Sequence, residues 1–249
     1  MKTKLILGFT VYSIIAFSQT KVEKHIAVQP GSKLIMNFDY PELIKLQTWD
    51  KNEILITGTV SINEGENDNA FELQVKQEGN TIAVTSVIKD KENLPKRIVI
   101  KQGDTEYVFR AKDVNDPEVQ KFFDQHGREY SYISNGLAHH ITLNVFVPEQ
   151  LSTETESKFG MVEVVKFNAP LSVVAKHGGI DASITTTATG VIIARTEFGE
   201  ILSNLDIKFN SESPGKVGGR WTNVMAKPGV GPAYNFESKF GNVYLRKGN

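Results

Sequence analysis

One short unit recurs along the C-terminal half of the chain, and it restricts the possible folds more than any other feature. Each copy carries a glycine with an apolar residue two positions later, and the letters ESKFG occur unchanged at Glu156 and at Glu237. Neighbouring copies lie about 18 to 22 residues apart. Self-similarity at a nearly constant period is typical of repeat proteins, in which equivalent units stack on one another. The five aligned glycines are Gly160, Gly178, Gly199, Gly219 and Gly241.

The residues around each glycine predict a corner followed by a strand. A residue without a Cβ suits a corner in which the backbone takes positive φ. The alternation of polar and apolar residues after it is the pattern of a strand with one buried face. A second apolar run, such as Leu171 to Lys176, completes each unit. The aromatic residues directly before the glycines are expected to stack as a column: Phe159, His177, Phe198 and Phe240.

The predicted fold class is all-β. We expect a single-domain β-solenoid or β-helix-like stack of roughly 20-residue, two-strand rungs, interrupted by one short helical insertion. A β-sandwich is the alternative, because its turns are also closely spaced. Its strands occupy inequivalent places, however, and would have no reason to repeat the same Phe-Gly corner.

The N-terminal half follows the same pattern less strictly. Residues 19–101 are predicted to form more irregular strands, and residues 140–249 the regular repeats. Between Asp39 and Ile62 we expect a rung in which Pro41 takes the place of the corner glycine. Further strands are predicted at Phe71 to Gln77, Thr81 to Val87, Arg97 to Gln102 and His140 to Pro148.

Residues 102–136 interrupt the repeat with a segment of different character. Asp116 is predicted to cap a short helix that has Pro117 at its first position and Gly127 after its end. The apolar residues Val119, Phe122 and Phe123 would share one face of this helix.

This insertion is also rich in large aromatic residues, which allow two interpretations. Exposed rings would suit a binding surface for a partner protein or for sugar rings. Alternatively, the segment caps the open edge of the stack, since an uncovered edge invites aggregation. We favour the cap. The residues of the candidate binding surface are Tyr107, Phe109, Phe122, Phe123, Tyr130 and Tyr132.

Residues 1–18 are typical of a secretory signal peptide, because two lysines precede an apolar stretch that ends in small residues. Cleavage is expected between Ser18 and Gln19. The apolar stretch is shorter than the roughly 20 residues that cross a bilayer, and no later segment is apolar enough. The chain has no cysteine, which excludes disulfides and lipid attachment through an N-terminal cysteine. We therefore expect an exported protein, periplasmic or extracellular, that is not a lipoprotein and has no membrane span after cleavage.

The charge balance excludes some partners. The whole chain carries a formal net charge of −1, and loss of the two lysines of the signal makes it more negative. Such a balance attracts neither nucleic acid nor an anionic membrane.

A family resemblance is carried by the stretch DYPELIKLQTWDKNEILITGTV, by VPEQLSTETESKFGMVEV and by the repeated glycine corners behind a cleavable signal. Together they resemble the "putative adhesin" β-strand-repeat family. The resemblance is clearest over residues 31–62 and 142–249, whereas residues 103–136 depart from it. It implies a β-helix-like fold and an envelope or secreted location, and it brings no catalytic residues.

The competing functional class is an enzyme, because β-helices also carry polysaccharide lyases and hydrolases. Their chemistry needs two or three carboxylates close together. The outward positions three residues after the glycines hold one neighbouring acid pair, and acids on a solvated face are usually only solvated. These positions are Glu163, Asp181, Leu202, Thr222 and Tyr244.

No motif for a metal, a phosphate or a nucleophile is present. His139 and His140 are adjacent on a predicted strand, so their side chains point to opposite faces and cannot share one ion. We expect a non-catalytic protein without a cofactor, with a structural, adhesion or binding role in a bacterial cell envelope. The expected partner is an envelope protein or a glycan. The alternative is a β-helix protein that binds or cleaves polysaccharide.

Overall fold

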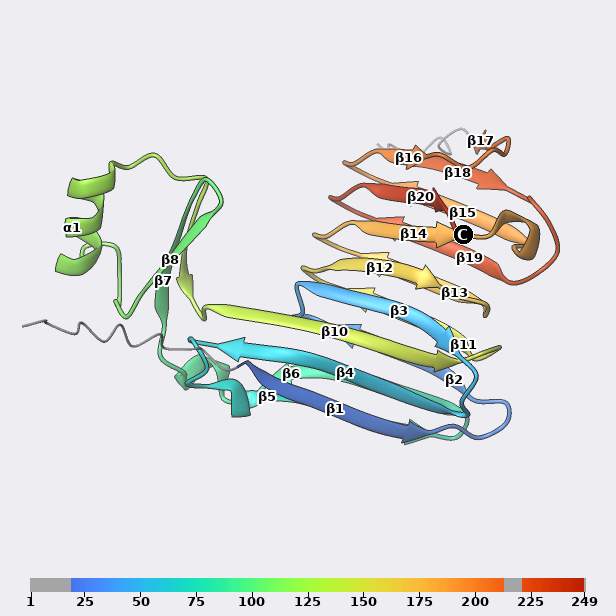
Figure 1. The fold of residues 1–249 in the computed structure, drawn as a ribbon, viewed down its shortest axis with the longest axis horizontal. Helices are drawn as coiled ribbons and strands as arrows, with labels where there is room; N and C mark the ends of the chain where they lie inside the picture. The colour runs from blue at the N-terminus through green and yellow to red at the C-terminus, as the bar shows by residue number, and fades with distance from the viewer. Residues whose placement is uncertain (1–18, 213–220, 249) are drawn as a thin grey trace, which may run out of the picture.

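The computed structural model describes residues 19–212 and 221–248 (Figure 1). The predicted signal peptide and Gly219 lie outside these residues. The described chain is mostly β-structure, as predicted, with one α-helix. Its strands form sheets of eight, nine and three strands.

The eight-stranded sheet contains the strands that follow the corners. From β10 to β16 all neighbours are parallel, and β1 and β4 extend one side as antiparallel strands. In spatial order the strands are β1 (Thr20–Ala27), β4 (Glu53–Ile62), β10 (His139–Pro148), β3 (Leu43–Trp49), β12 (Met161–Lys166), β14 (Ile180–Ile184), β20 (Val243–Lys247) and β16 (Ile201–Ser203).

The nine-stranded sheet contains the strands that precede the corners. It is parallel from β15 to β6 and antiparallel at both ends. In spatial order the strands are β17 (Asn210–Glu212), β18 (Thr222–Ala226), β15 (Val191–Thr196), β19 (Ala233–Ser238), β13 (Leu171–Ala175), β11 (Ser152–Ser157), β2 (Lys33–Phe38), β6 (Thr81–Ile88) and β5 (Phe71–Glu78).

The main core lies between these two sheets. Alternate residues of each strand point inward, as in β3, where Ile44 and Leu46 are fully buried, and in β19, where Phe236 is. The two sheets keep separate strand orders and antiparallel ends, so they do not form a closed solenoid. Short 3-10 helices lie at Asp68–Ala70, Lys91–Asn93 and Thr186–Ala188.

The repeated units do not stack in the order of the sequence. The C-terminal unit lies between the second and third copies, because β20 pairs with both β14 and β16 while β19 pairs with both β13 and β15. The copy around Trp221 is not an equivalent rung. The strand after it, β18, belongs to the nine-stranded sheet and runs antiparallel to β15.

The corner glycines are required for a different reason from the one expected. Positive φ was predicted, but among the described corners none of the glycines has it. Instead, a Cβ on Gly178 would lie 2.1 Å from the carbonyl oxygen of Gly160, and a Cβ on Gly241 would lie 2.2 Å from that of Gly178. Gly199 faces Gly241 in the same way, and Gly160 faces Pro41. The corners form a column so tight that only hydrogen fits between one backbone and the next.

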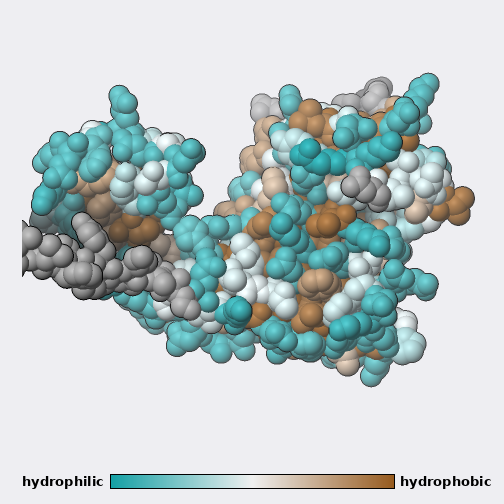
Figure 2. Space-filling view, viewed as in Figure 1, coloured by the Kyte–Doolittle hydropathy of each residue, from teal (hydrophilic) through white to brown (hydrophobic). Residues whose placement is uncertain are grey.

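The third sheet and the helix form a small unit beside the stack (Figure 1). Its strands lie in the order β8 (Thr105–Phe109), β7 (Arg97–Gln102) and β9 (Tyr132–Gly136), all antiparallel. β7 was expected among the strands of the main stack, but its apolar alternation serves this separate sheet. Figure 2 shows apolar side chains between the helix and the small sheet.

The helix α1 (Pro117–His126) begins and ends as predicted. The carboxylate of Asp116 accepts a hydrogen bond from the backbone N–H of Glu118, and Gly127 follows the last residue. Val119, Phe122 and Phe123 are buried against the small sheet, in a core separate from that of the stack. The favoured interpretation, a cap over the edge of the stack, is therefore wrong: the helix covers its own sheet.

We predict that Gly178→Ala lowers the free energy of unfolding by about 1 to 3 kcal/mol, because the new methyl group must push two corner backbones apart. Gly136→Ala is the matched control, since a Cβ there meets no atom within 4 Å. It should change stability by no more than about 0.5 kcal/mol. Urea denaturation followed by circular dichroism measures both. Equal midpoints for Gly178→Ala and the native chain would contradict the tight column.

Candidate functional site

An aromatic ladder runs along the corners of the stack. The ring centroids of Phe159 and His177 are 5.2 Å apart, those of His177 and Phe240 5.1 Å, and those of Phe240 and Phe198 5.1 Å. The interplanar angles are 18°, 4° and 6°, so the rings are nearly parallel. The three phenylalanines are 46 to 55% exposed. The corners leading into β12, β14 and β20 lie at the edge of the stack that faces the small unit (Figure 1).

The parallel register of the strands positions this ladder. Residues two places before the rings pair from strand to strand and are fully buried: Ser157, Ala175, Ser238 and Thr196. The Ser157 hydroxyl donates to the Gly160 carbonyl at 2.8 Å, and the Ser238 hydroxyl donates to the Gly178 carbonyl at 3.0 Å. The buried hydroxyls thus satisfy corner carbonyls, and each ring is held at the same height on its rung.

Charged side chains accompany the rings. The ammonium of Lys158 lies 5.2 Å from the Phe159 centroid, and that of Lys239 lies 5.3 Å from the Phe240 centroid. Neighbouring rings stack on both sides of Phe240. The ladder consequently offers solvent a row of ring edges with lysines beside them.

A pocket of about 320 Å³ lies at the Phe159 end of the ladder. The next corner is the one at Pro41, where Tyr40 precedes the proline as Phe159 precedes its glycine. Tyr40 does not continue the stack. Its ring instead contacts His139 edge to face, with centroids 6.3 Å apart. Other residues that line this pocket are Ile88, Lys91, Glu92, Lys96, Asn135, Gly136 and Leu137.

Beyond this pocket, an ionic contact joins the stack to the small unit. His140 Nδ1 lies 3.1 Å from Glu42 Oε1 in the stack, and His140 Nε2 lies 2.9 Å from Glu106 Oε1 in the small sheet. Lys101 also pairs with Glu106, at 3.1 Å. The hydrogen bond to Glu42, together with the two negative charges, outweighs partial burial and raises the pKa of His140 to about 9.

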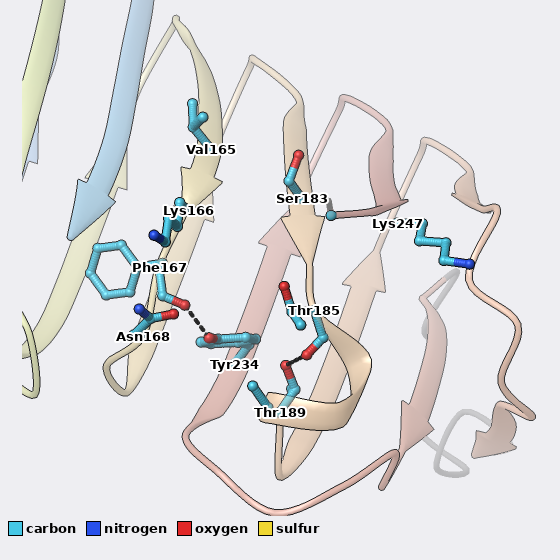
Figure 3. Close-up of a pocket in the computed structure, with 11 residues that line it drawn as sticks. Val165, Lys166, Phe167, Asn168, Ser183, Thr185, Thr189, Tyr234 and Lys247 are labelled. Carbon is cyan, nitrogen blue, oxygen red and sulfur yellow. Dashed lines mark hydrogen bonds between the residues drawn. The ribbon is translucent and has the colours of Figure 1, made fainter. Parts of the chain in front are cut away.

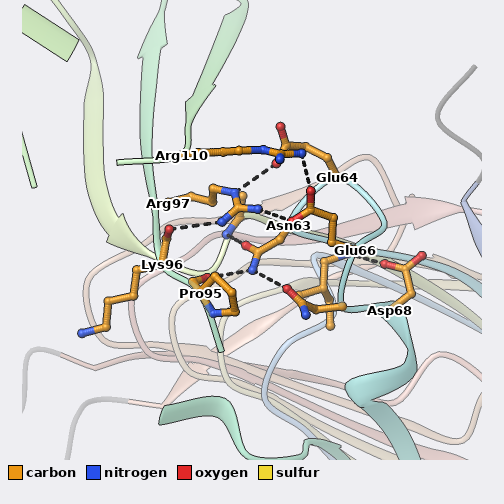
Figure 4. Close-up of polar contacts among 11 residues, drawn as sticks. Asn63, Glu64, Glu66, Asp68, Pro95, Lys96, Arg97 and Arg110 are labelled. Carbon is orange, nitrogen blue, oxygen red and sulfur yellow. Dashed lines mark hydrogen bonds and ion pairs between the residues drawn. The ribbon is translucent and has the colours of Figure 1, made fainter. Parts of the chain in front are cut away.

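A second polar cluster holds the same unit from its other side (Figure 4). The side chain of Arg97, only 4% exposed, lies 3.1 Å from Glu64 and 2.6 Å from Glu66. Arg110 pairs with the other carboxylate oxygen of Glu66. Asn63 donates to the Pro95 carbonyl at 2.7 Å and accepts from the Ala138 backbone at 3.2 Å. These contacts anchor both chain connections of the small unit on the loop after β4.

A further pocket of about 330 Å³ opens at the opposite ends of the strands (Figure 3). The Tyr234 hydroxyl donates to the Phe167 carbonyl, and the Thr189 hydroxyl donates to the Thr185 carbonyl at 2.9 Å. Burial raises the pKa of Tyr234. The inner polar groups of this pocket are thus already bonded within the chain, which points to a structural role.

The candidate binding residues of the insertion do not form one surface. Phe122 and Phe123 are buried, and the rings of Tyr107 and Phe109 pack on Phe122 with centroids 4.7 and 5.3 Å away. Tyr130 and Tyr132 are exposed. Exposed rings gather instead on the ladder. The sequence predicts this column of rings as a structural feature. It does not predict that the rings are exposed, because nothing in the repeat says which side of the corner meets solvent.

The outward acids are held in ion pairs. Glu163 lies 3.0 Å from Lys45 and Asp181 lies 2.6 Å from Arg246, each on a neighbouring strand. The row of acids does not continue along the sheet. On the next strand, β20, the residue that pairs with Asp181 is Tyr244, and Thr222 lies in the other sheet. In the described part of the chain, no three potential ligands among His, Asp and Glu gather around a metal position.

Comparisons with known proteins show no family. No family model matches the chain, and no curated protein matches it. Two solved structures are similar at 10% identity over 92% of this chain. One, a "putative cell adhesion protein" from Clostridium sporogenes, is covered over 100% of its length with a TM-score of 0.45. The other, a "putative adhesin" from Bacteroides fragilis, is covered over 98% with a TM-score of 0.22. Likeness of this degree carries no information about a ligand.

None of the helices in the described part of the chain has the length and apolar character that crossing a bilayer requires.

We predict that His140 titrates near pH 9 in the folded chain, which nuclear magnetic resonance of the imidazole C–H protons measures directly. A folded-state pKa above the unfolded value of about 6.5 means that the ion pairs stabilise the fold fully below that value. Their contribution is lost as the pH rises through about 9. Glu42→Gln should lower the midpoint, whereas Glu163→Gln, remote from His140, should not. A His140 midpoint below pH 7 would refute the ionic contact.

Proposed function

We propose that the chain is an exported, non-catalytic binding protein of a bacterial cell envelope that holds an extended glycan along the aromatic ladder. The observation that carries this proposal is the exposed, evenly spaced row of four stacked rings. Apolar side chains gathered on a surface are typical of contact sites. Rings of this kind suit carbohydrate, whose C–H groups contact aromatic surfaces while its hydroxyls bond to neighbouring polar groups.

The regular spacing favours a polymer over a compact ligand. Neighbouring rings are 5.1 to 5.2 Å apart, since each is placed by one rung of the stack. An extended polysaccharide advances by a similar distance for each sugar. One sugar can therefore contact each rung, with Lys158 and Lys239 donating hydrogen bonds from the side. In this proposal the repeated units act as the coils of an open solenoid.

The non-catalytic part of the proposal is supported by the acids of the outward face. Glu163 and Asp181 are paired with Lys45 and Arg246. An acid engaged in an ion pair is not placed to protonate a leaving group, which a glycosidase requires of one carboxylic acid. The exported location is supported by the signal pattern of residues 1–18.

The test is binding of the chain from Gln19 to a panel of soluble polysaccharides, measured by affinity electrophoresis. Phe198→Ala and Phe240→Leu should each weaken binding about 2- to 10-fold, the equivalent of 0.5 to 1.5 kcal/mol for one aromatic contact. Tyr132→Ala is the matched control, because Tyr132 is 51% exposed but lies on the small sheet.

Two results would reject the proposal. One is binding that the ladder variants leave unchanged while their unfolding midpoints fall, which would make the ladder purely structural. The other is the absence of binding to any polysaccharide in the panel. Release of reducing ends during incubation would reject the non-catalytic part.

A further inference from the structure

We infer that the pocket at the Phe159 end of the ladder is a binding site for one carboxylated sugar ring, a hexuronate. This inference adds a site to the proposed function. It rests on that function because the polymer is proposed to run along the ladder towards this pocket. It stands on three separate features of the pocket: the exposed ring that ends the ladder, an apolar wall, and two ammonium groups without an ion pair in the described residues.

The last ring of the ladder is that of Phe159, which lines the pocket. His177 stacks on one side of this ring at 5.2 Å, and within the described residues no ring stacks on the other. The position that would continue the ladder is that of Tyr40, one corner further on, but Tyr40 turns to His139. The aromatic row therefore ends at Phe159, at the border of the pocket.

The ammonium of Lys158 lies over this ring. It is 5.2 Å from the Phe159 centroid, nearly the same as the 5.3 Å between Lys239 and Phe240. Lys158 thus places a positive charge over the last ring of the ladder. It is further held toward Asp39, at 3.8 Å.

The remaining walls suit one pyranose ring. Tyr40, Ile88 and Leu137 provide apolar contact in addition to Phe159, and Asn135 and His139 provide polar groups. The volume of about 320 Å³ is at the small end of the range typical of small-molecule sites. A sugar has the required combination, an apolar C–H face and a polar rim.

The charges select an anionic ring. Lys91 and Lys96 line the pocket, and in the described part of the chain neither has an ion-pair partner. Lys91 instead lies over the Tyr40 ring, 5.2 Å from its centroid. The rim holds one carboxylate, that of Glu92, against these two ammonium groups. The excess of positive charge, beside aromatic faces, favours a ring that carries a carboxylate.

The experiment is a titration of the ¹⁵N-labelled chain from Gln19 with sodium glucuronate, and separately with glucose, followed by amide chemical shifts. Glucuronate should move the signals of Asn135 to His139 in a saturable way. Glucose should bind at least about tenfold more weakly, which corresponds to one charge-assisted hydrogen bond. Galacturonate is a third arm that tests whether the carboxylate or the ring stereochemistry decides.

Two variants carry the assignment. Lys91→Gln with Lys96→Gln should reduce glucuronate affinity at least tenfold and leave glucose unchanged, and Phe159→Leu should weaken both sugars. Lys166→Gln with Lys247→Gln, at the pocket on the opposite edge, is the matched control. Native unfolding midpoints in all variants establish that the fold is retained.

The outcomes separate this inference from the proposed function. Equal affinity for glucose and glucuronate, no saturable shift, or a Lys91 and Lys96 variant that binds like the native chain would each overturn the inference. Saturable glucuronate binding without any polysaccharide binding would uphold the pocket and reject the proposed function. Polysaccharide binding that needs Phe198 and Phe240 but not Lys91 and Lys96 would do the reverse.

Discussion

Successive corner backbones approach one another so closely that no Cβ fits between them, and the rest of the structure depends on this approach. At Gly178 and Gly241 the space of a side chain is taken by the carbonyl oxygen of the preceding corner. This approach sets a single register for the parallel strands on both sides of the corner, since a shift of one residue would bring a Cβ into the column. The same register aligns the buried hydroxyls beneath the corners and the rings above them. A feature of the backbone thus creates the aromatic surface.

The small unit adds what the repeat alone does not supply. A corner column can form a ladder, but it cannot enclose a pocket, because every rung presents the same profile. The unit of β7, β8, β9 and α1 has its own core and is anchored by Arg97 on one side and by His140 on the other. The Arg97 side chain is almost fully buried, so loss of its acidic partners would leave an uncompensated charge. The chain between these anchors contributes one wall of the pocket at Phe159.

Local patterns predict the elements of this fold better than their arrangement. The strands at Phe71, Thr81, Arg97 and His140 and the capped helix follow from alternation and from turn chemistry, and the structure confirms them. The order of the rungs could not be predicted, since each unit offers the same apolar face and the same corner to either neighbour. β7 was placed in the main stack for the same reason: its alternation fits any half-buried strand. The glycines were recognised but misinterpreted, because a sequence does not distinguish a need for positive φ from a lack of space. The pocket was missed altogether, as its residues come from four separate segments.

The order of the rungs has a consequence for the ladder. In sequence order the fourth copy carries Gly218 at the ring position, between Phe198 and Phe240. A stack built in that order would have a gap in its aromatic row. Insertion of the C-terminal unit beside His177 removes the gap, because Phe240 then contacts both His177 and Phe198. The effect of this order falls on the solvent side, where it makes four rings continuous and leaves Phe159 at the end of the row that borders the small unit.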